Sequence, residues 1–201
     1  MTRKSLVLPV VIAAALVAGI GALTTGAEEK PKHQYIGSEK CKLCHKTEAQ
    51  GQQYVLWSQS EHAKAYTMLA GEEAKAVAKK LGIEDPQKSD KCLKCHVTAF
   101  GVAAELLGPK YTIEEGVGCE ACHGAGGDYN KKATMEGITR GEIAAASVGL
   151  VIPSEKVCVG CHNQESPTFK AFKYDEMAKK IAHPLPAERK ALYKTEKKAE
   201  G

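Results

Sequence analysis

Eight cysteines and four of the seven histidines of this 201-residue chain fall into one arrangement, Cys-x-x-Cys-His, which occurs four times. Two thiols at this spacing can add to the vinyl groups of one porphyrin, and the histidine that follows can bind its iron as the proximal ligand. The arrangement predicts four covalently bound c-type haems (iron porphyrins). The attaching cysteines are Cys41, Cys44, Cys92, Cys95, Cys119, Cys122, Cys158 and Cys161, and the proximal ligands are His45, His96, His123 and His162.

Two other uses of paired cysteines compete with haem. Zinc sites with four thiolate ligands each would account for all eight thiols, and an oxidising compartment would favour disulfides. Neither explains the histidine after every pair. With 7 histidines in 201 residues, four such placements by chance are expected on the order of once in a million sequences. We therefore favour haem, with zinc and disulfides as the alternatives.

The number of possible distal ligands is limited. A six-coordinate haem needs a second axial ligand, for which His and Met are the usual donors. Outside the four motifs the chain has three histidines, His33, His62 and His183. Each could be a packing residue, but four irons favour ligation, more strongly at His62 and His183 than at His33. At least one haem must therefore use methionine (Met135 is the best candidate), use a donor from a partner chain, or stay open.

The N-terminus has the layout of a secretory signal peptide. Arg3 and Lys4 precede an uncharged apolar stretch at residues 6–23, and small residues end at Ala27. We expect residues 1–27 to be removed, which places the protein in the periplasm or otherwise outside the cytoplasm, with no stable membrane insertion after signal cleavage. An uncleaved anchor is the alternative, although one proline and two glycines inside the stretch weaken it.

Composition bounds the partners and the core. Without the two basic residues of the signal, the 28 Lys and Arg become 26 against 24 Asp and Glu, a formal charge of +2. This small excess gives no reason to expect nucleic-acid binding, which usually needs a concentrated basic patch. Only 11 residues are Phe, Trp or Tyr. So few large apolar side chains predict a thin core that the haems themselves fill.

Short helices are expected at the motifs. Serine and an acidic residue stand before the first, second and fourth motifs, at residues 38–39, 89–90 and 154–155. Serine is a favoured N-cap and acidic residues suit the first helical turn, so a helix should begin at each. The third motif follows Gly116 and Gly118 instead, which suggests that its backbone runs close to a porphyrin.

Helices are also expected between the motifs, and no strand pattern appears. A capping box at residues 58–61 predicts a helix with His62, Tyr66 and Leu69 on one face. The fold class is therefore mainly α, with short helices and long loops wrapped around the haems in one domain, residues 28–186. We expect the charged tail, residues 187–201, to be disordered. Three further helices are expected at residues 72–80, 142–147 and 176–182.

The segments around the motifs resemble the cytochrome c-554 family. They read, in order, "SEKCKLCHKTEAQ", "SEHAKAY", "KCLKCHVTAFG", "YTIEEGVGCEACHGAGG" and "FKYDEMAKKIAH", and they span residues 36–183. The resemblance implies a compact multihaem cytochrome c with haems stacked in close pairs. It also implies that His62 is the distal ligand of the fourth haem, that His183 is that of the third, and that the second has no distal protein ligand. Family members accept electrons from hydroxylamine oxidoreductase, and relatives serve other multihaem respiratory chains.

The chain departs from this family at one ligand. The family has a histidine shortly after the third motif, as distal ligand of the first haem, whereas residues 124–132 here read "GAGGDYNKK". We therefore expect the first haem to take Met135, or failing that His33, as its sixth ligand. Methionine would raise the potential of this haem above that of a haem with two histidine ligands.

Three functions are compatible with these features. We favour a periplasmic tetrahaem c-type cytochrome that acts as an electron-transfer carrier in a respiratory chain, between redox partner proteins that the sequence does not name. An enzyme that reduces a small nitrogen oxide at an open haem iron is one alternative. A protomer of a haem filament, completed by a ligand from a partner chain, is the other.

Overall fold

A computed structural model of the chain describes residues 33–185. Residues 1–32 and 186–201 are outside this part, so the expected signal peptide at 1–27 and the expected tail at 187–201 lie outside the described residues. The chain divides into two units, Met1–Pro31 and Lys32–Gly201, and all described residues belong to the second.

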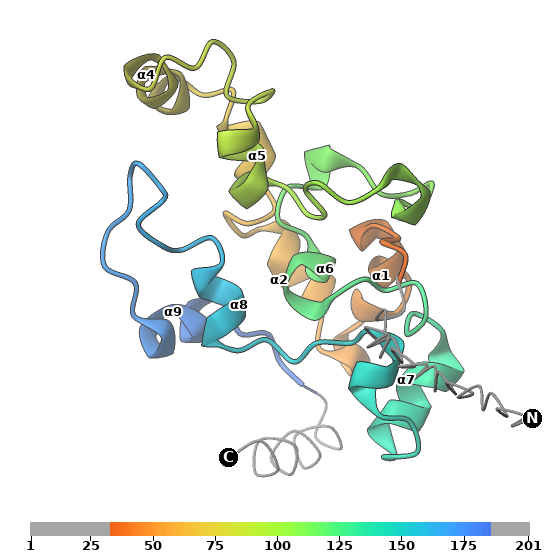
Figure 1. The fold of residues 1–201 in the computed structure, drawn as a ribbon. Coiled ribbons are helices and arrows are strands. Elements are labelled where there is room, and N and C mark those ends of the chain that lie inside the picture. Colours follow the sequence, from red (N-terminus) through yellow and green to blue (C-terminus); the bar gives the residue numbers. More distant parts are fainter. Residues whose placement is uncertain (1–32, 186–201) are drawn as a thin grey trace, which may run out of the picture. The chain divides into compact units, whose positions relative to one another are not determined.

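Short helices joined by long loops make up the described chain (Figure 1). Its only β-pairing is an isolated parallel bridge between Tyr35 and Leu107. The prediction of a mainly α fold is therefore confirmed. The α-helices are α1 (Ser38–His45), α2 (Gln53–Ser58), α3 (Ala65–Met68), α4 (Glu72–Lys80), α5 (Asp90–His96), α6 (Cys119–His123), α7 (Lys132–Thr139), α8 (Glu155–Val159) and α9 (Tyr174–Ile181). The 3₁₀ helices are η1 (Glu48–Gln50), η2 (Ala104–Leu106), η3 (Ile113–Glu115) and η4 (Ala145–Val148).

A helix begins at or just before every Cys-x-x-Cys-His motif. α5 and α8 follow Ser89 and Ser154 as predicted, although neither serine makes a side-chain capping bond. α1 begins one residue early, because Gly37 is its N-cap and Ser38 is its first helical residue. The Ser38 hydroxyl instead accepts a hydrogen bond of 3.1 Å from the amide of Cys119. This bond joins the first motif to the third.

The prediction of a helix that begins at residue 58 is wrong. α2 ends at Ser58, residues 59–64 form turns, and only α3 follows. The carbonyl oxygen of His62 explains the interruption. It accepts from Ala65 N in a turn (3.2 Å) and from the distant Val117 N (2.9 Å). A tertiary contact thus replaces the helical i→i+4 bond that the capping-box pattern predicts.

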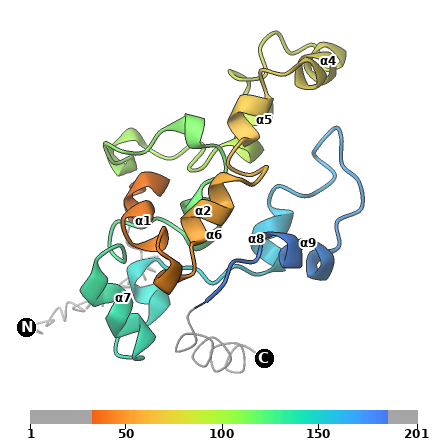
Figure 2. The same cartoon turned by 180° about the vertical axis from the view of Figure 1, so that it is seen from behind.

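The predictions of the other helices are confirmed in part. α4 has the expected bounds, and α9 starts two residues earlier than expected. Residues 142–147 are not an α-helix, because Glu142 N and Ile143 N both bond back to Gly137 O at the end of α7. Only η4 remains there. Neither α2 nor α7 was expected from the sequence. α1 packs against α2, and the two lie together when seen from behind (Figure 2).

The protein core is thin, as the composition predicts. Within residues 33–185, the buried apolar side chains are few and mostly small or medium in size. Several large apolar residues are exposed instead, among them Leu43 at 70% and Phe100 at 40%. The buried apolar residues are Ile36, Ala65, Leu69, Ala78, Val97, Ala125, Tyr129 and Ile138.

A buried carboxylate organises the centre of this fold. Glu120, inside the third motif, is 2% exposed. Its oxygens accept hydrogen bonds from the amides of Ile36, Gly37 and Gly126, at 2.6–3.1 Å. Three backbone donors compensate the cost of burying this charge. Glu120 thereby holds the segment before α1 against the loop after α6.

Candidate haem sites

Two pairs of histidine rings face each other across the gap that a metal ion needs. The centroids of His123 and His183 are 6.0 Å apart, and so are those of His62 and His162. Imidazole nitrogens bind transition metals at about 2 Å, so an ion between two rings separates their centroids by roughly 6 Å. These residues therefore fit an iron held between two histidines. They are also the pairs that the family resemblance implies for the third and fourth haems.

Electrostatics favours the neutral, metal-binding form of these rings. Burial, followed by the proximity of His183 and His45, lowers the pKa of His123 to about 4. Burial also lowers the pKa of His62, with His162 as the second cause. The pKa of His183 is lowered by burial and then by His45. Its Nδ1 is buried and has no hydrogen-bond partner among residues 33–185.

Hydrogen bonds to Nδ1 orient three of the four histidines predicted to be proximal ligands. The acceptors are Gln53 Oε1 for His45 (3.2 Å), the Ala65 carbonyl for His96 (2.7 Å) and the Val151 carbonyl for His123 (3.3 Å). Such bonds fix the tautomer and leave Nε2 to bind a metal. The fourth, His162, is held differently, because its ring stacks on Phe172 at a centroid distance of 4.8 Å.

The positions of the cysteines show which of the four motifs are neighbours in space. In the haem-bound protein these sulfurs are thioethers, so contacts between the free thiols report only which attachment points are close. Cys41 lies close to Cys119, and Cys95 lies close to Cys161. Burial raises the pKa of Cys122 to about 11, with the nearby Cys158 as the next cause. The attachment points therefore run from the first motif to the third, the fourth and the second.

The surroundings of the motifs suit an apolar ring better than a bare metal ion. Leu43 and Val159, inside the first and fourth motifs, and Phe100, just after the second, are exposed large apolar residues that a porphyrin would cover. None of the eight cysteines is paired in a disulfide. The described residues contain no group of three or more His, Cys, Asp or Glu side chains placed to hold a metal ion.

The remaining candidate ligands lie apart from these pairs. His33 Nδ1 is 2.5 Å from the Asp128 carboxylate, and its side chain is 15% exposed. Met135 is half-buried on α7, and its backbone oxygen accepts a bond from Thr139. Within residues 33–185, neither His45 nor His96 faces a second histidine ring at a comparable distance.

The glycines before the third motif approach protein atoms. Gly116 has a φ of +68°, and a Cβ there would lie 2.8 Å from the His62 carbonyl oxygen. A Cβ on Gly118 would lie within 2.5 Å of side-chain oxygens of Glu115 and Ser38. The structure therefore explains these glycines by close protein contacts, among them the backbone that carries His62, and the approach to a porphyrin stays a prediction.

Sequence reasoning missed three acidic residues around the first and third motifs: Asp128, Glu120 and Glu115. Glu115 accepts a bond of 2.8 Å from Ser38 N, while its Oε1 has no partner in the described part of the chain. Burial raises its pKa, with the charge of Glu120 as a further cause. The only sequence signal was the glutamate at position 120, inside the third motif. It could not be recognised as structural from the sequence, because only its burial in the fold makes it unusual.

None of the described helices combines the length and the apolar character that crossing a membrane requires.

Comparison with known proteins adds a family. Residues 40–124 match the family model described as "Cytochrome c554 and c-prime". The chain is 32% identical over 207 residues to cytochrome c-554 of Nitrosomonas europaea, covering 86% of this chain and 84% of that protein. It is 31% identical over 90 residues to the multiheme cytochrome MtrA of Shewanella baltica, covering 42% of this chain and 26% of that protein. No solved structure matches.

Proposed function

The chain belongs to the cytochrome c-554 family, and we propose that it is a periplasmic tetrahaem cytochrome that carries electrons between redox proteins of a respiratory chain. Family membership makes it a c-type cytochrome, an electron carrier with covalently bound haem. The number of haems, the compartment and the partners are the proposed part. Four complete Cys-x-x-Cys-His motifs support the number.

The observation that carries the proposal is the series formed by the four attachment points. The first and third motifs meet at Cys41 and Cys119, and the second and fourth meet at Cys95 and Cys161. Cys122 of the third motif and Cys158 of the fourth are near enough to interact electrostatically, which links the two pairs. Haem supplies the one-electron chemistry at each point. The chain's contribution is to hold these points close together, so that an electron can enter at one end of the series and leave at the other.

The histidine pairs fit transfer better than turnover. His123 with His183, and His62 with His162, would fill both axial positions of the third and fourth haems. A filled iron has no position for a substrate, so these two central sites can only pass electrons. Residues 1–27 support an exported location, and a near-neutral polypeptide gives no reason to expect nucleic acid as a partner.

Haem counting and cell fractionation test this function together. The full chain, expressed in a bacterium with a cytochrome c maturation system, should appear in the periplasmic fraction with four haems per polypeptide. The purified, reduced protein should transfer electrons rapidly to an oxidised small cytochrome in stopped-flow mixing. A cytoplasmic location, fewer haems per chain, or electron transfer no faster than autoxidation would contradict the proposal.

One observation favours a second function at the second haem. The Ala65 carbonyl holds His96, and no second histidine ring faces His96 among the described residues. An open iron there could bind and reduce a small nitrogen oxide. Nitric oxide or nitrite should then change the spectrum of one haem in the reduced protein and support turnover. An unchanged spectrum would exclude this activity.

A further inference from the structure

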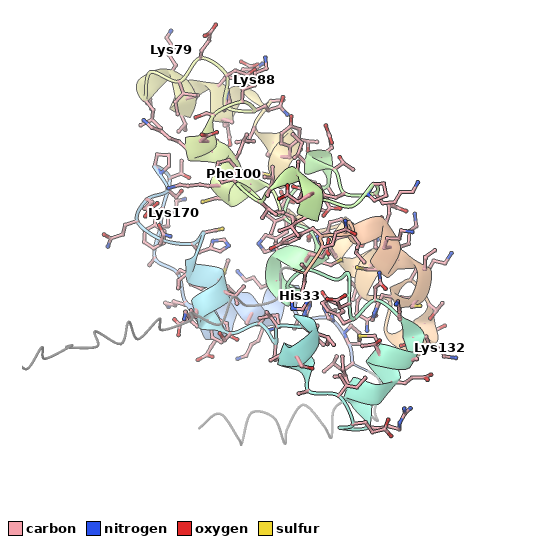
Figure 3. All side chains as sticks on the ribbon, turned by 45° about the vertical axis from the view of Figure 1, so that its right-hand side comes forward. His33, Lys79, Lys88, Phe100, Lys132 and Lys170 are labelled. Atoms are coloured by element: carbon pink, nitrogen blue, oxygen red, sulfur yellow. The ribbon has the colours of Figure 1, made fainter. Side chains whose placement is uncertain are left out.

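His33 is held by the loop that follows the third motif, although it precedes the first motif in sequence. Its Nδ1 meets the Asp128 carboxylate at 2.5 Å. Its ring lies so close to Gly149 that a Cβ on this glycine would be 2.5 Å from the His33 Cδ2. Figure 3 shows His33 inside the ribbon, whereas the labelled lysines lie at its edge.

The backbone around His33 is fixed as firmly as the side chain. The Gly127 amide donates to the carbonyl of Gln34 at 2.9 Å. Two residues further on, the Glu120 carboxylate binds the amides of Ile36 and Gly37. These bonds hold the chain on the C-terminal side of His33. They place His33 beside the third motif and close in sequence to the first, which begins at Cys41, seven residues after Gln34.

Elimination then assigns the iron that this histidine can reach. His62 and His183 already face His162 and His123. The second motif lies elsewhere, because His96 is held by α3 and Cys95 meets Cys161 of the fourth motif. His33 therefore lies beside the first and third motifs, and the third already has its histidine pair. Only the first haem remains. Among the described residues His33 and His45 do not form a ring pair like the other two, so this assignment rests on elimination and on the contacts around His33.

Asp128 stands where it can act through His33. A carboxylate that accepts a hydrogen bond from one nitrogen of a metal-bound histidine fixes the tautomer and makes the ring a stronger donor. With Nδ1 on Asp128, Nε2 is the nitrogen left for iron. We infer that His33 is the sixth ligand of the first haem and that Asp128 positions it. This inference rests on the proposed function, since it needs a haem at the first motif.

The assignment reverses the order expected from the sequence, in which Met135 came first. Met135 lies on α7, where its amide donates to Lys131 O at 3.0 Å and its carbonyl oxygen accepts from the Thr139 hydroxyl. His33 and Asp128 together replace the loop histidine that the family pattern would supply. The loop after the third motif thus still contributes to the site, because its Asp128 orients His33, which comes from another segment.

Spin-state counting on the full holoprotein tests this inference. Electron paramagnetic resonance of the oxidised wild type should show three low-spin haems and one high-spin haem, and near-infrared spectra should show no methionine–iron charge-transfer band. His33→Ala should convert one low-spin haem to high-spin, whereas Met135→Leu should leave the pattern unchanged. Asp128→Asn should keep this haem low-spin but raise its reduction potential. Asp85→Asn is the control, because it also removes one carboxylate charge but at a position away from His33.

Each contrary result is decisive. A methionine–iron band in the wild type, conversion of a haem in Met135→Leu, or an unchanged pattern in His33→Ala would overturn the assignment. If His33→Ala yields no holoprotein, the wild-type spectrum and the Asp128→Asn potential still decide. If the first haem has the same reduction potential in Asp128→Asn as in Asp85→Asn, Asp128 does not position His33. Failure of the proposed function would appear separately, as fewer than four haems per chain.

Discussion

At the residue scale, histidine chemistry in this chain is set by what each ring touches. Sequence alone identified all seven histidines as candidate ligands, because four follow cysteine pairs and only three are left. It did not identify their orienting partners. The Ala65 carbonyl and Asp128 come from distant segments, Gln53 lies eight residues after His45, and nothing in their local sequence marks any of them. Contacts between residues far apart in sequence depend on the whole fold.

His62 gives the first residue-scale prediction. Its ring faces His162 at 6.0 Å, so His62→Ala should leave the fourth haem without its distal ligand. One haem should then show high-spin marker bands in resonance Raman spectra of the oxidised protein. Lys64→Ala, an exposed change two residues away, is the control. Retention of every low-spin haem in His62→Ala would show that His62 only packs against His162.

Glu115 gives a prediction about pH. Burial raises the pKa of this carboxyl above its ordinary value of 4.5, so the folded protein binds the proton more tightly than the unfolded chain. The resulting stability is present below pH 4.5 and is lost as pH rises through the higher folded pKa. Glu115→Gln should remove this loss, and its melting temperature relative to wild type should increase from pH 4 to pH 7. Glu84→Gln, on the surface, should show no such trend; parallel curves for Glu115→Gln and wild type would contradict the prediction.

At the scale of elements, local sequence signals worked where tertiary contacts agree with them. α4 has acidic residues in its first turn, lysines in its last, and the predicted bounds. The helix expected at residue 58 failed because Val117 takes the His62 carbonyl. α2 and α7 were missed because neither has a capping bond or a conventional N-cap residue in its sequence. The described helices are short, so packing rather than propensity decides many of their ends.

Gly116 links two elements and can be tested against a matched glycine. Gly116→Ala forces an alanine to a φ of +68° and brings its Cβ to 2.8 Å from the His62 oxygen. Gly141→Ala has a similar φ of +72° but meets nothing within 4 Å. A positive φ costs a residue with a Cβ roughly 1–3 kcal/mol, and Gly116, whose ψ of −134° lies outside the left-handed helical region, should fall toward the upper end of this range.

The clash should make the Gly116 variant worse. We expect Gly116→Ala to lose more unfolding free energy than Gly141→Ala in denaturant titrations, and to perturb the spectrum of the haem that His62 serves. Equal losses for the two variants would mean that the contact between Gly116 and the His62 backbone relaxes without cost.

At the scale of the whole molecule, the few buried apolar residues explain why the sequence predicts the cofactor better than the fold. Large apolar side chains such as Leu43 and Val159 are exposed beside the cysteines that would carry haem. Covering them needs a flat apolar group at each motif, which is what covalent haem provides. Five consecutive residues are enough to identify each haem attachment site. The spatial order of the sites, from the first to the third, the fourth and the second, can be seen only in the folded structure.

Peptide mass spectrometry of the matured protein tests this account most directly. After proteolysis, each of the four peptides that contain Cys41, Cys92, Cys119 and Cys158 should carry the mass of one haem, with no free thiol at any of the eight cysteines. Unmodified thiols, disulfides or zinc at these positions, in protein made by a host that matures c-type cytochromes, would contradict it.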